Sequence, residues 1–319
     1  MGNNILVTIA IPLYNKEQYI ERCFYSVAKQ IYKNIECIIV EDCSTDNSLE
    51  LAECLIREYI GDIKFVLIRH DQNYGLSISR NTGINNANGE YLFFFDADDE
   101  ITENCISTLV ALAEKYPGID MIQGNRIRRD KSVDALKTKE GKLPEYVKGN
   151  SNIKKACYKN IHITTWNKLV RKDFIKSNYL YFKKGLIHQD SHWKIFYLKY
   201  IESFAFTNEV TYIYNIVPDS IKTNLNLSLS ISSRLTIVED MLNNLDIDLL
   251  DEQLLRICEL LKEQKKRIFS DKKYSSFIPK YKTLQARVPN TCYFIFLPIR
   301  LLGITLIRAI KAIVRGIIS

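Results

Sequence analysis

The chain of 319 residues is long enough to bury one large core with an appendage, or two smaller cores. Its hydrophobic content of 46% and charged content of 25% exclude a disordered or fibrous chain and are typical of globular proteins. The net charge of +7 is uneven, because residues 262–319 carry +11 and the remainder carries about −4. We expect no nucleic-acid partner, because no recognition motif accompanies this charge.

The cysteines and the N-terminal residues both indicate a reducing compartment. The eight cysteines form no CxxC pair, and several lie in apolar stretches, as reduced core residues do. Residues 5–11 have the pattern of a strand and not of a signal peptide, and no run of 18 apolar residues predicts a spanning helix. We expect a cytoplasmic protein.

The first 125 residues alternate strand and helix patterns, which predicts parallel βα units. Apolar runs predict four strands, over residues 5–11, 35–40, 64–69 and 91–95. Helically spaced apolar residues predict three helices between them, over 20–31, 49–59 and 76–87. Asn15 is the predicted N-cap of the first helix. The glycine loops of nicotinamide dehydrogenases and P-loop NTPases are missing from this region.

Polar side chains follow each predicted strand. They are Tyr14 and Asn15, Asp42, Asp71 and Asp96, in strand order. In open α/β sheets, ligands bind in the crevice outside the carboxyl ends of the strands. These four strand ends therefore predict one polar crevice.

The fourth strand, in YLFFFDADD at residues 91–99, ends in three carboxylates, Asp96, Asp98 and Asp99. Such a concentration of negative charge favours a divalent cation, and so few hard oxygen ligands suit Mg²⁺ or Mn²⁺ that also binds substrate phosphates. The alternative is a solvated acidic loop, with Asp99 near the N-terminus of the following helix.

Four segments in this order resemble the family 2 glycosyltransferases, which have the GT-A fold. The segments are IAIPLYNKEQYI, IIVEDCSTDNS, NYGLSISRNTGI and YLFFFDADD, and the resemblance covers residues 5–220. It implies a nucleotide-sugar donor, usually a UDP-sugar, a divalent metal at the DxD element, and inversion at the anomeric carbon. Cys43 stands where the family usually has glycine.

The resemblance also implies roles for individual donor-side residues. Pro12 and Tyr14 would line the nucleotide pocket, and Asp42 would accept a hydrogen bond from the uracil N–H. Arg80 would lie near the base or the phosphates. Asp96 and Asp98, the two aspartates of the DxD element, would contact the ribose, the sugar and the metal. Asp99 is a further candidate metal ligand. The alternatives are a helix-capping Asp42, an exposed Arg80, and a Tyr14 that packs on Tyr19.

The acceptor side follows an exposed connection predicted over residues 126–149, where apolar periodicity fades. The segment WNKLVR, residues 166–171, is similar to WNKLYR in many family members. Trp166 would stack on a sugar and Lys168 would approach a phosphate, or the two would be a buried Trp and a surface Lys. The segment at 212–220 resembles the one that closes the family's catalytic domain.

Residues 185–193, GLIHQDSHW, contain the candidate general base. The family often has a Glu-Asp pair here; Asp190 matches the Asp, and Gln189 replaces the Glu. Transfer requires a carboxylate that takes the proton of the acceptor hydroxyl. His188 and His192 are candidates for the acceptor side or the core, and a zinc pair is a weaker alternative because no HExxH is present.

The C-terminal region is predicted to be helical. Apolar spacing predicts two helices between residues 228 and 261. Within 291–319, Arg300, Arg308, Lys311 and Arg315 fall in a sector of roughly 80° on a helix, and the other faces are apolar. This pattern favours a helix in the interface of an anionic membrane, and the alternative is a helix packed on the protein body or on a dimer partner.

The sequence thus predicts an α/β protein of the GT-A (Rossmann-like) type, with a mixed, mostly parallel sheet flanked by helices and a C-terminal helical extension. The catalytic domain is expected at 1–225, with a nucleotide-sugar half at 1–125 and an acceptor half at 126–225, and the helical region at 226–319.

The expected activity is inverting, Mn²⁺- or Mg²⁺-dependent transfer of a sugar from a nucleotide, usually UDP, to a glycan or lipid-linked acceptor in surface polysaccharide or glycolipid assembly. The expected location is the inner face of the cell membrane, and an oligomer is left open. The alternatives are a sugar-phosphate nucleotidyltransferase and a catalytically silent membrane-bound scaffold.

Overall fold

The first 94 residues of the chain form the predicted succession of strands and helices. The computed structural model describes residues 5–129, 137–138, 141–142, 144–160, 163–217 and 226–288. The first seven elements are β1 (Val7–Leu13), α1 (Ile20–Ala28), β2 (Ile35–Glu41), α2 (Ser48–Glu58), β3 (Lys64–Arg69), α3 (Leu76–Asn86) and β4 (Tyr91–Phe94). Each predicted element is present, and most ends differ by one or two residues.

Asn15 is not the N-cap of α1. The helix begins at Ile20, and Tyr19 occupies the cap position. Asn15 instead has a left-handed backbone, φ 49°, and its Oδ1 accepts a hydrogen bond from the Thr45 N–H at 2.8 Å. Asparagine tolerates this left-handed conformation better than most residues. Through the hydrogen bond to Thr45, the Asn15 side chain joins the loop after β1 to the loop after β2.

The remaining elements of the main sheet and its helices follow between residues 100 and 214. They are β5 (Glu100–Ile101), α4 (Cys105–Lys115), β6 (Met121–Arg128), β9 (Tyr146–Lys148), α5 (Asn150–Asn160), β10 (Lys168–Arg171), α6 (Lys172–Ser177), α7 (Gln189–Tyr200) and β11 (Ser203–Tyr214). A separate ladder joins β7 (Lys137–Thr138) and β8 (Gly141–Lys142).

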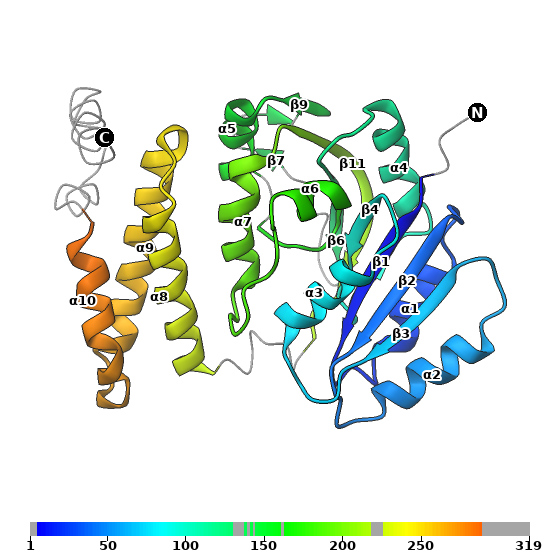
Figure 1. The fold of residues 1–319 in the computed structure, drawn as a ribbon, viewed down its shortest axis with the longest axis horizontal. Helices are drawn as coiled ribbons and strands as arrows, with labels where there is room; N and C mark the ends of the chain where they lie inside the picture. Colours follow the sequence, from blue (N-terminus) through cyan, green and yellow to red (C-terminus); the bar gives the residue numbers. More distant parts are fainter. Residues whose placement is uncertain are drawn as a thin grey trace. The chain divides into compact units, whose positions relative to one another are not determined.

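The main sheet has the strand order β3-β2-β1-β4-β10-β6-β11-β5, and β9 also pairs with β11. Figure 1 shows its strands β3, β2 and β1 side by side. The strands β1 to β4 run parallel, and β10 runs antiparallel to both β4 and β6. The sheet is therefore mixed and mostly parallel, as predicted. The strand order reverses beside β1, because β2 lies on one side of it and β4 on the other, and this is where open α/β sheets bind ligands.

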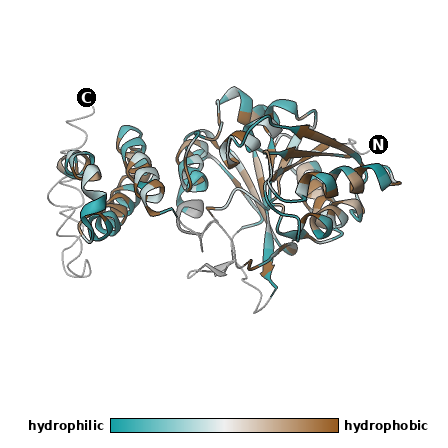
Figure 2. Ribbon diagram, turned by 90° about the horizontal axis from the view of Figure 1, so that it is seen from below, coloured by the Kyte–Doolittle hydropathy of each residue, from teal (hydrophilic) through white to brown (hydrophobic). Residues whose placement is uncertain are grey.

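Alternation along the strands directs side chains to two helical layers. Val7, Ile9 and Ile11 share one core with residues of α1 and α4, such as Phe24. On the opposite face, Ala10 lies against Gly83 of α3. Figure 2 shows hydrophobic residues along the strands, and hydrophobic and hydrophilic residues mixed around the helices. Each fully buried aliphatic side chain in such a core contributes about 1.5–3 kcal/mol.

The chain divides into two compact units, Met1–Ser233 and Arg234–Ser319. The second unit contains the end of α8 (Leu227–Asn243), a short turn η1 (Ile247–Leu249), α9 (Leu250–Ile268), η2 (Lys272–Phe277) and α10 (Ile278–Ala286). The helical C-terminal extension is thus present. The amphipathic segment predicted at 291–319 lies outside the described residues. Within the part of the chain that is described, no helix combines the length and hydrophobicity needed to cross a bilayer.

Candidate active site

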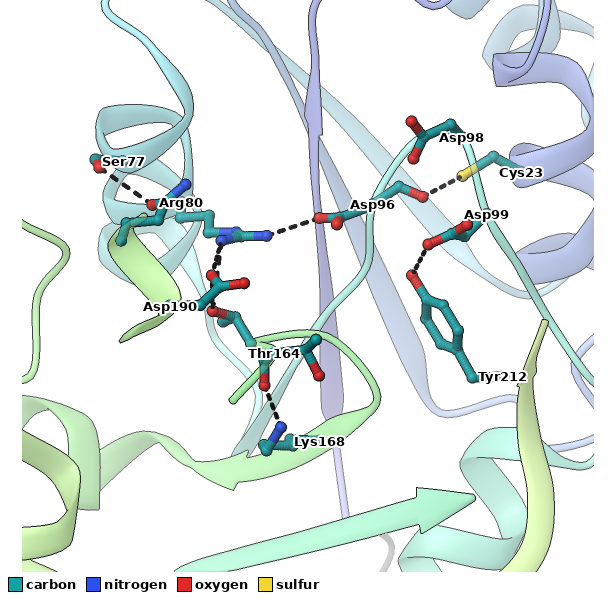
Figure 3. A network of polar contacts seen from close by, with 12 residues as sticks. Cys23, Ser77, Arg80, Asp96, Asp98, Asp99, Thr164, Lys168, Asp190 and Tyr212 are labelled. Carbon is teal, nitrogen blue, oxygen red and sulfur yellow. Dashed lines mark hydrogen bonds and ion pairs between the residues drawn. The ribbon is translucent and has the colours of Figure 1, made fainter. Parts of the chain in front are cut away.

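The acidic turn after β4 holds its three aspartates in three different environments. Phe95 is fully buried and extends the apolar run of the strand, and the Asp99 N–H then donates to the Asp96 carbonyl at 3.1 Å, closing the turn. Figure 3 shows that the side chains of Asp96, Asp98 and Asp99 have different neighbours. Their chemistry must therefore be considered one residue at a time.

Asp96 is paired with Arg80, which α3 carries to the centre of the site. The Arg80 Nη2 lies 2.7 Å from Asp96 Oδ1, and its Nη1 lies 2.9 Å from Asp190 Oδ1 (Figure 3). Only 2% of the Arg80 side chain is exposed. Burial raises the pKa of the Asp96 carboxyl, Arg80 opposes this shift, and Asp98 and Asp190 add to it. The alternative of an exposed surface arginine is therefore wrong.

Asp190 lies in the first turn of α7, with its side chain 30% exposed. Its Oδ1 accepts hydrogen bonds from Arg80 and from the Thr165 hydroxyl, the latter at 2.6 Å. Both contacts engage Oδ1, and none that is described engages Oδ2. Oδ2 is therefore the atom that can accept a proton or contact a hydroxyl. Thr165 was not predicted from the sequence, although it directly precedes the WNKLVR segment.

Gln189 explains why a neutral side chain can stand where the family often has Glu. It is 2% exposed, and its Oε1 accepts a hydrogen bond from the Ser77 hydroxyl on α3 at 3.1 Å. A buried carboxylate at this position would add a negative charge next to Asp190, at a cost in desolvation. The amide avoids that cost and still joins α7 to α3.

Asp98 is paired with a cation from the loop after β1. Lys16 Nζ lies 2.7 Å from Asp98 Oδ2, and the two side chains are 23% and 20% exposed. The Asp98 carbonyl accepts from Arg22 Nη2 at 3.2 Å. Lys16 also was not singled out, although it stands inside the IAIPLYNKEQYI segment.

Asp99 is almost fully buried and accepts two internal hydrogen bonds. Its Oδ2 accepts from the Tyr212 hydroxyl at 2.7 Å, and its Oδ1 accepts from the Asn215 N–H at 2.8 Å. Burial raises the pKa of Asp99 to about 8, and Asp98 and Asp96 add to this. These contacts join the acidic turn to the end of β11 and favour a structural role over direct metal ligation.

The donor set fits a divalent metal that shares its ligands with a substrate. The described residues include no group of three or more His, Cys, Asp or Glu side chains placed to hold a metal ion. Asp98 and Asp96 offer carboxylate oxygens, which Mg²⁺ and Mn²⁺ prefer. Because the protein supplies so few ligands, the phosphates of a donor would have to complete the shell.

Asp42 lies at the end of β2 and is only 2% exposed. Its Oδ1 lies 2.7 Å from His70 Nδ1 and accepts from the Tyr74 N–H, and its Oδ2 accepts from the Gly75 N–H at 2.7 Å. Asp42 therefore fixes the loop that enters α3 and does not cap α2. Among the described residues, Oδ2 accepts a single hydrogen bond, so a carboxylate lone pair is left there for a further donor.

Pro12 and Tyr14 lie at the end of β1, where the nucleotide pocket was predicted. Pro12 pairs in register with Val40 of β2, next to the strand end that carries Asp42. Tyr14 is 42% exposed. Base stacking by Tyr14 remains a prediction.

Trp166 and Lys168 are more buried than an acceptor-binding role would require. Trp166 is 6% exposed and stacks on Tyr212, with ring centroids 4.5 Å apart and planes 13° apart. Lys168 is fully buried, and its Nζ donates to the Thr164 carbonyl. These placements favour a structural role for both side chains and exclude a surface Lys168.

The two histidines flank the start of α7. His188 is the cap residue, and its Nε2 lies 3.2 Å from the Ser230 hydroxyl. His192 is 5% exposed and lies against Phe196, with ring centroids 4.9 Å apart. Acceptor contact by either imidazole remains a prediction.

Comparisons with known proteins identify the family of this chain. The model of the family described as Glycosyl transferase family 2 matches residues 8–178, more than half of the chain. The chain therefore belongs to glycosyl transferase family 2. The matched residues include the acidic turn, Arg80, Asp42 and Thr165.

Individual relatives and structures support the family and the fold. The chain is 30% identical over 227 residues to glycosyltransferase GlyA of Streptococcus pneumoniae, which covers 66% of this chain and 30% of GlyA. The structure of Staphylococcus aureus TarS with UDP-GlcNAc matches with a TM-score of 0.66 and 19% identity, covering 90% of this chain and 83% of that one. The mannosyltransferase PcManGT of Pyrobaculum calidifontis, with GDP-Man and Mn²⁺, matches with a TM-score of 0.58 and 14% identity, covering 89% and 86%. These two likenesses show the GT-A fold.

The aligned region spans 27 to 62% of the lengths of the curated relatives. Activity, substrates and partners of this chain are accordingly proposals.

Proposed function

We propose that this chain is an inverting, metal-dependent glycosyltransferase that uses a nucleotide-sugar donor. The observation that carries the proposal is the ion-paired network Asp96–Arg80–Asp190, which joins the DxD turn to the candidate base. A donor bound at the DxD turn would thereby lie within reach of a carboxylate on another element. Family membership argues against a sugar-phosphate nucleotidyltransferase.

In the proposed reaction, Asp190 takes a proton from the acceptor hydroxyl. The oxygen of that hydroxyl forms a bond to the anomeric carbon, while the bond from this carbon to the phosphate oxygen breaks. The electron pair leaves with the nucleoside diphosphate, and the proton goes to Asp190 Oδ2. Because Arg80 and Thr165 engage Oδ1, they orient Oδ2 as the base atom.

Asp98 would hold Mn²⁺ or Mg²⁺ together with Asp96 and the donor diphosphate. When bound, such a cation neutralises the negative charge that develops on the leaving diphosphate. The protein itself holds positive charge at the same place, because Lys16 contacts Asp98 and Arg80 contacts Asp96.

The proposed nucleotide is UDP. Asp42 Oδ2 has a lone pair for the uracil N–H, and its position is fixed by the Gly75 N–H. The exposed ring of Tyr14 offers a stacking surface at the neighbouring strand end. TarS was solved with UDP-GlcNAc, although PcManGT was solved with GDP-Man. A comparison of UDP- and GDP-sugars therefore tests this assignment.

The proposed acceptor is a glycan or lipid-linked hydroxyl in surface polysaccharide or glycolipid assembly. The expected site of action is the inner face of the cell membrane, where the basic, amphipathic segment 291–319 would bind anionic lipid. Binding to anionic vesicles that survives removal of residues 291–319 would contradict this part of the proposal.

Transfer by wild-type protein and by Asp190→Asn tests the proposed reaction. The assay combines nucleotide sugars, Mn²⁺ and a membrane lipid extract as the acceptor source, and it measures released nucleotide and thermal shift. We expect Asp190→Asn to keep the donor-induced thermal shift and to lose transfer by at least about 100-fold, the contribution of a positioned base. The exposed Asp62→Asn should behave as wild type. Full activity of Asp190→Asn would remove Asp190 as the base.

A further inference from the structure

Lys16 is ion-paired with Asp98, the residue proposed above to hold the metal ion. Its Nζ lies 2.7 Å from Asp98 Oδ2, at the end of β1 where the strand order reverses. A divalent cation that binds Asp98 would therefore meet an ammonium group already in contact with the same carboxylate.

The position of Lys16 is set by its backbone, and its side chain retains freedom. The Lys16 N–H donates to the Ser48 hydroxyl at 2.7 Å, which anchors the loop to the start of α2. The side chain is 23% exposed, and Nζ lies 5.7 Å from the centre of the Tyr19 ring. A lysine ammonium is a compact charge on a flexible stem, so Nζ can leave Asp98 while the main chain stays in place.

Two neighbouring acidic groups have other cationic partners. Asp96 is paired with Arg80 at 2.7 Å, and Glu100 with Arg22 at 2.9 Å. Arg80 is almost fully buried, with its outer nitrogens fixed by two carboxylates. Of these three cations, Lys16 is the one that contacts Asp98, the proposed metal ligand, through a flexible and partly exposed side chain.

We propose that Lys16 is an exchangeable counter-ion of Asp98, which yields the carboxylate to the metal when the donor diphosphate arrives and then contacts that diphosphate. This inference rests on the proposed function, because it requires a diphosphate at the acidic turn.

The charges give this exchange its direction. A divalent cation without nucleotide would place two positive groups on one carboxylate, and their repulsion weakens binding. A diphosphate brings at least two negative charges, so it offers Lys16 a new partner while it adds ligands to the metal. Metal and donor should therefore bind cooperatively, with Lys16 as one source of the coupling.

Mn²⁺ binding by Lys16→Met tests the inference without requiring sugar transfer. Free Mn²⁺ is measured by electron paramagnetic resonance during titration of the full chain, with and without UDP, and in parallel with GDP. Without nucleotide, we expect Lys16→Met to bind Mn²⁺ about two- to fivefold more tightly than wild type, the effect of removing a partly exposed ion pair. With UDP, this gain should vanish, because the variant also lacks the contact to the diphosphate.

Two controls separate this exchange from a general charge effect. Lys16→Arg keeps the positive charge and should resemble wild type. Lys29→Met removes the same charge from the exposed C-terminal end of α1 and should also resemble wild type. Thermal unfolding of each variant checks that the fold is intact.

The outcomes distinguish this inference from the proposed function. Equal Mn²⁺ affinity of wild type and Lys16→Met without nucleotide would overturn it, as would a gain that persists unchanged with nucleotide. If the predicted Mn²⁺ pattern appears but no nucleotide sugar is turned over, the role of Lys16 stands and the proposed transfer fails.

Discussion

Arg80 and Asp190 lie 110 positions apart in the chain and meet at 2.9 Å in the site. Arg80 comes from α3 and Asp190 from α7. The same guanidinium contacts Asp96 at 2.7 Å. One buried cation thus fixes the relative position of the donor-side turn and the candidate base.

Replacing Arg80 should damage both stability and activity. Arg80→Ala leaves two carboxylates without their shared cation, so we expect the free energy of unfolding to fall by about 3 kcal/mol. Arg80→Lys keeps the charge but cannot contact both carboxylates with a planar fork, so a smaller loss is expected. Urea denaturation measures both. The exposed Arg57→Ala on α2 is the control and should change stability by less than about 0.5 kcal/mol.

Thr165 should act as a positioning residue for Asp190. Thr165→Val keeps the shape of the side chain and removes the hydrogen bond to Oδ1, measured at 2.6 Å. We expect kcat to fall about tenfold, part of the contribution of a positioned base, with little change in the KM for the donor. Thr165→Ser should restore most of kcat because it retains the hydroxyl. A change confined to the KM for the donor would contradict this role.

The approach of α3 to β1 should be limited by Gly83. A Cβ on this glycine would lie 2.9 Å from the Ala10 Cβ, too close for two carbon atoms. Gly83→Val should therefore push α3, and Arg80 with it, away from the sheet and destabilise the protein by about 2–3 kcal/mol. Asn85→Val places the same residue on the exposed side of α3 and controls for helix propensity. Similar losses from both variants would show that the close packing is unimportant.

Local patterns were sufficient to predict the first half of the fold. The four parallel strands and their helices follow from apolar periods of two and of 3.6 residues, which are readable within short windows. The rule that parallel strands end at one edge then predicted that Asp42 and Asp96 follow strands at the same edge of the sheet, and β2 and β4 do run parallel on either side of β1.

The remainder depends on contacts between distant segments. The insertion of β10 between β4 and β6 pairs Leu169 with Phe93, and no local pattern records that register. The contact of Arg80 with Asp190 likewise joins two helices. Trp166 and Lys168 were ambiguous because both residue types carry an apolar body and a polar group, so burial depends on neighbours such as Tyr212.

Asp99 should make stability depend on pH in a predictable direction. Its pKa is about 8 in the folded protein, above the ordinary value of 3.8, chiefly because it is buried. The folded state then binds more protons than the unfolded state between about pH 4 and 8, so this residue's contribution to stability falls as pH rises through that window. Denaturation of wild type and Asp99→Asn in EDTA, from pH 5 to 8, measures the effect as a difference. The variant should have the flatter curve, and parallel curves would contradict the prediction.

Asp99→Ala should be more damaging than Asp99→Asn. It leaves the Tyr212 hydroxyl and the Asn215 N–H without their acceptor. A loss of about 2 kcal/mol is expected from such unpaired buried groups, and urea denaturation at pH 7 measures it. Equal stability of the two variants would show that these hydrogen bonds contribute little.

The most direct test of the account is calorimetric titration of the protein with UDP- and GDP-sugars in the presence of Mn²⁺, repeated with EDTA and with Asp98→Ala. The account predicts that at least one donor binds, that EDTA and Asp98→Ala each abolish or strongly weaken this binding, and that Asp190→Asn leaves it intact. Donor binding that is unchanged by EDTA and by Asp98→Ala, or no binding by any donor, would contradict the claim that the turn after β4 holds a metal-bound diphosphate.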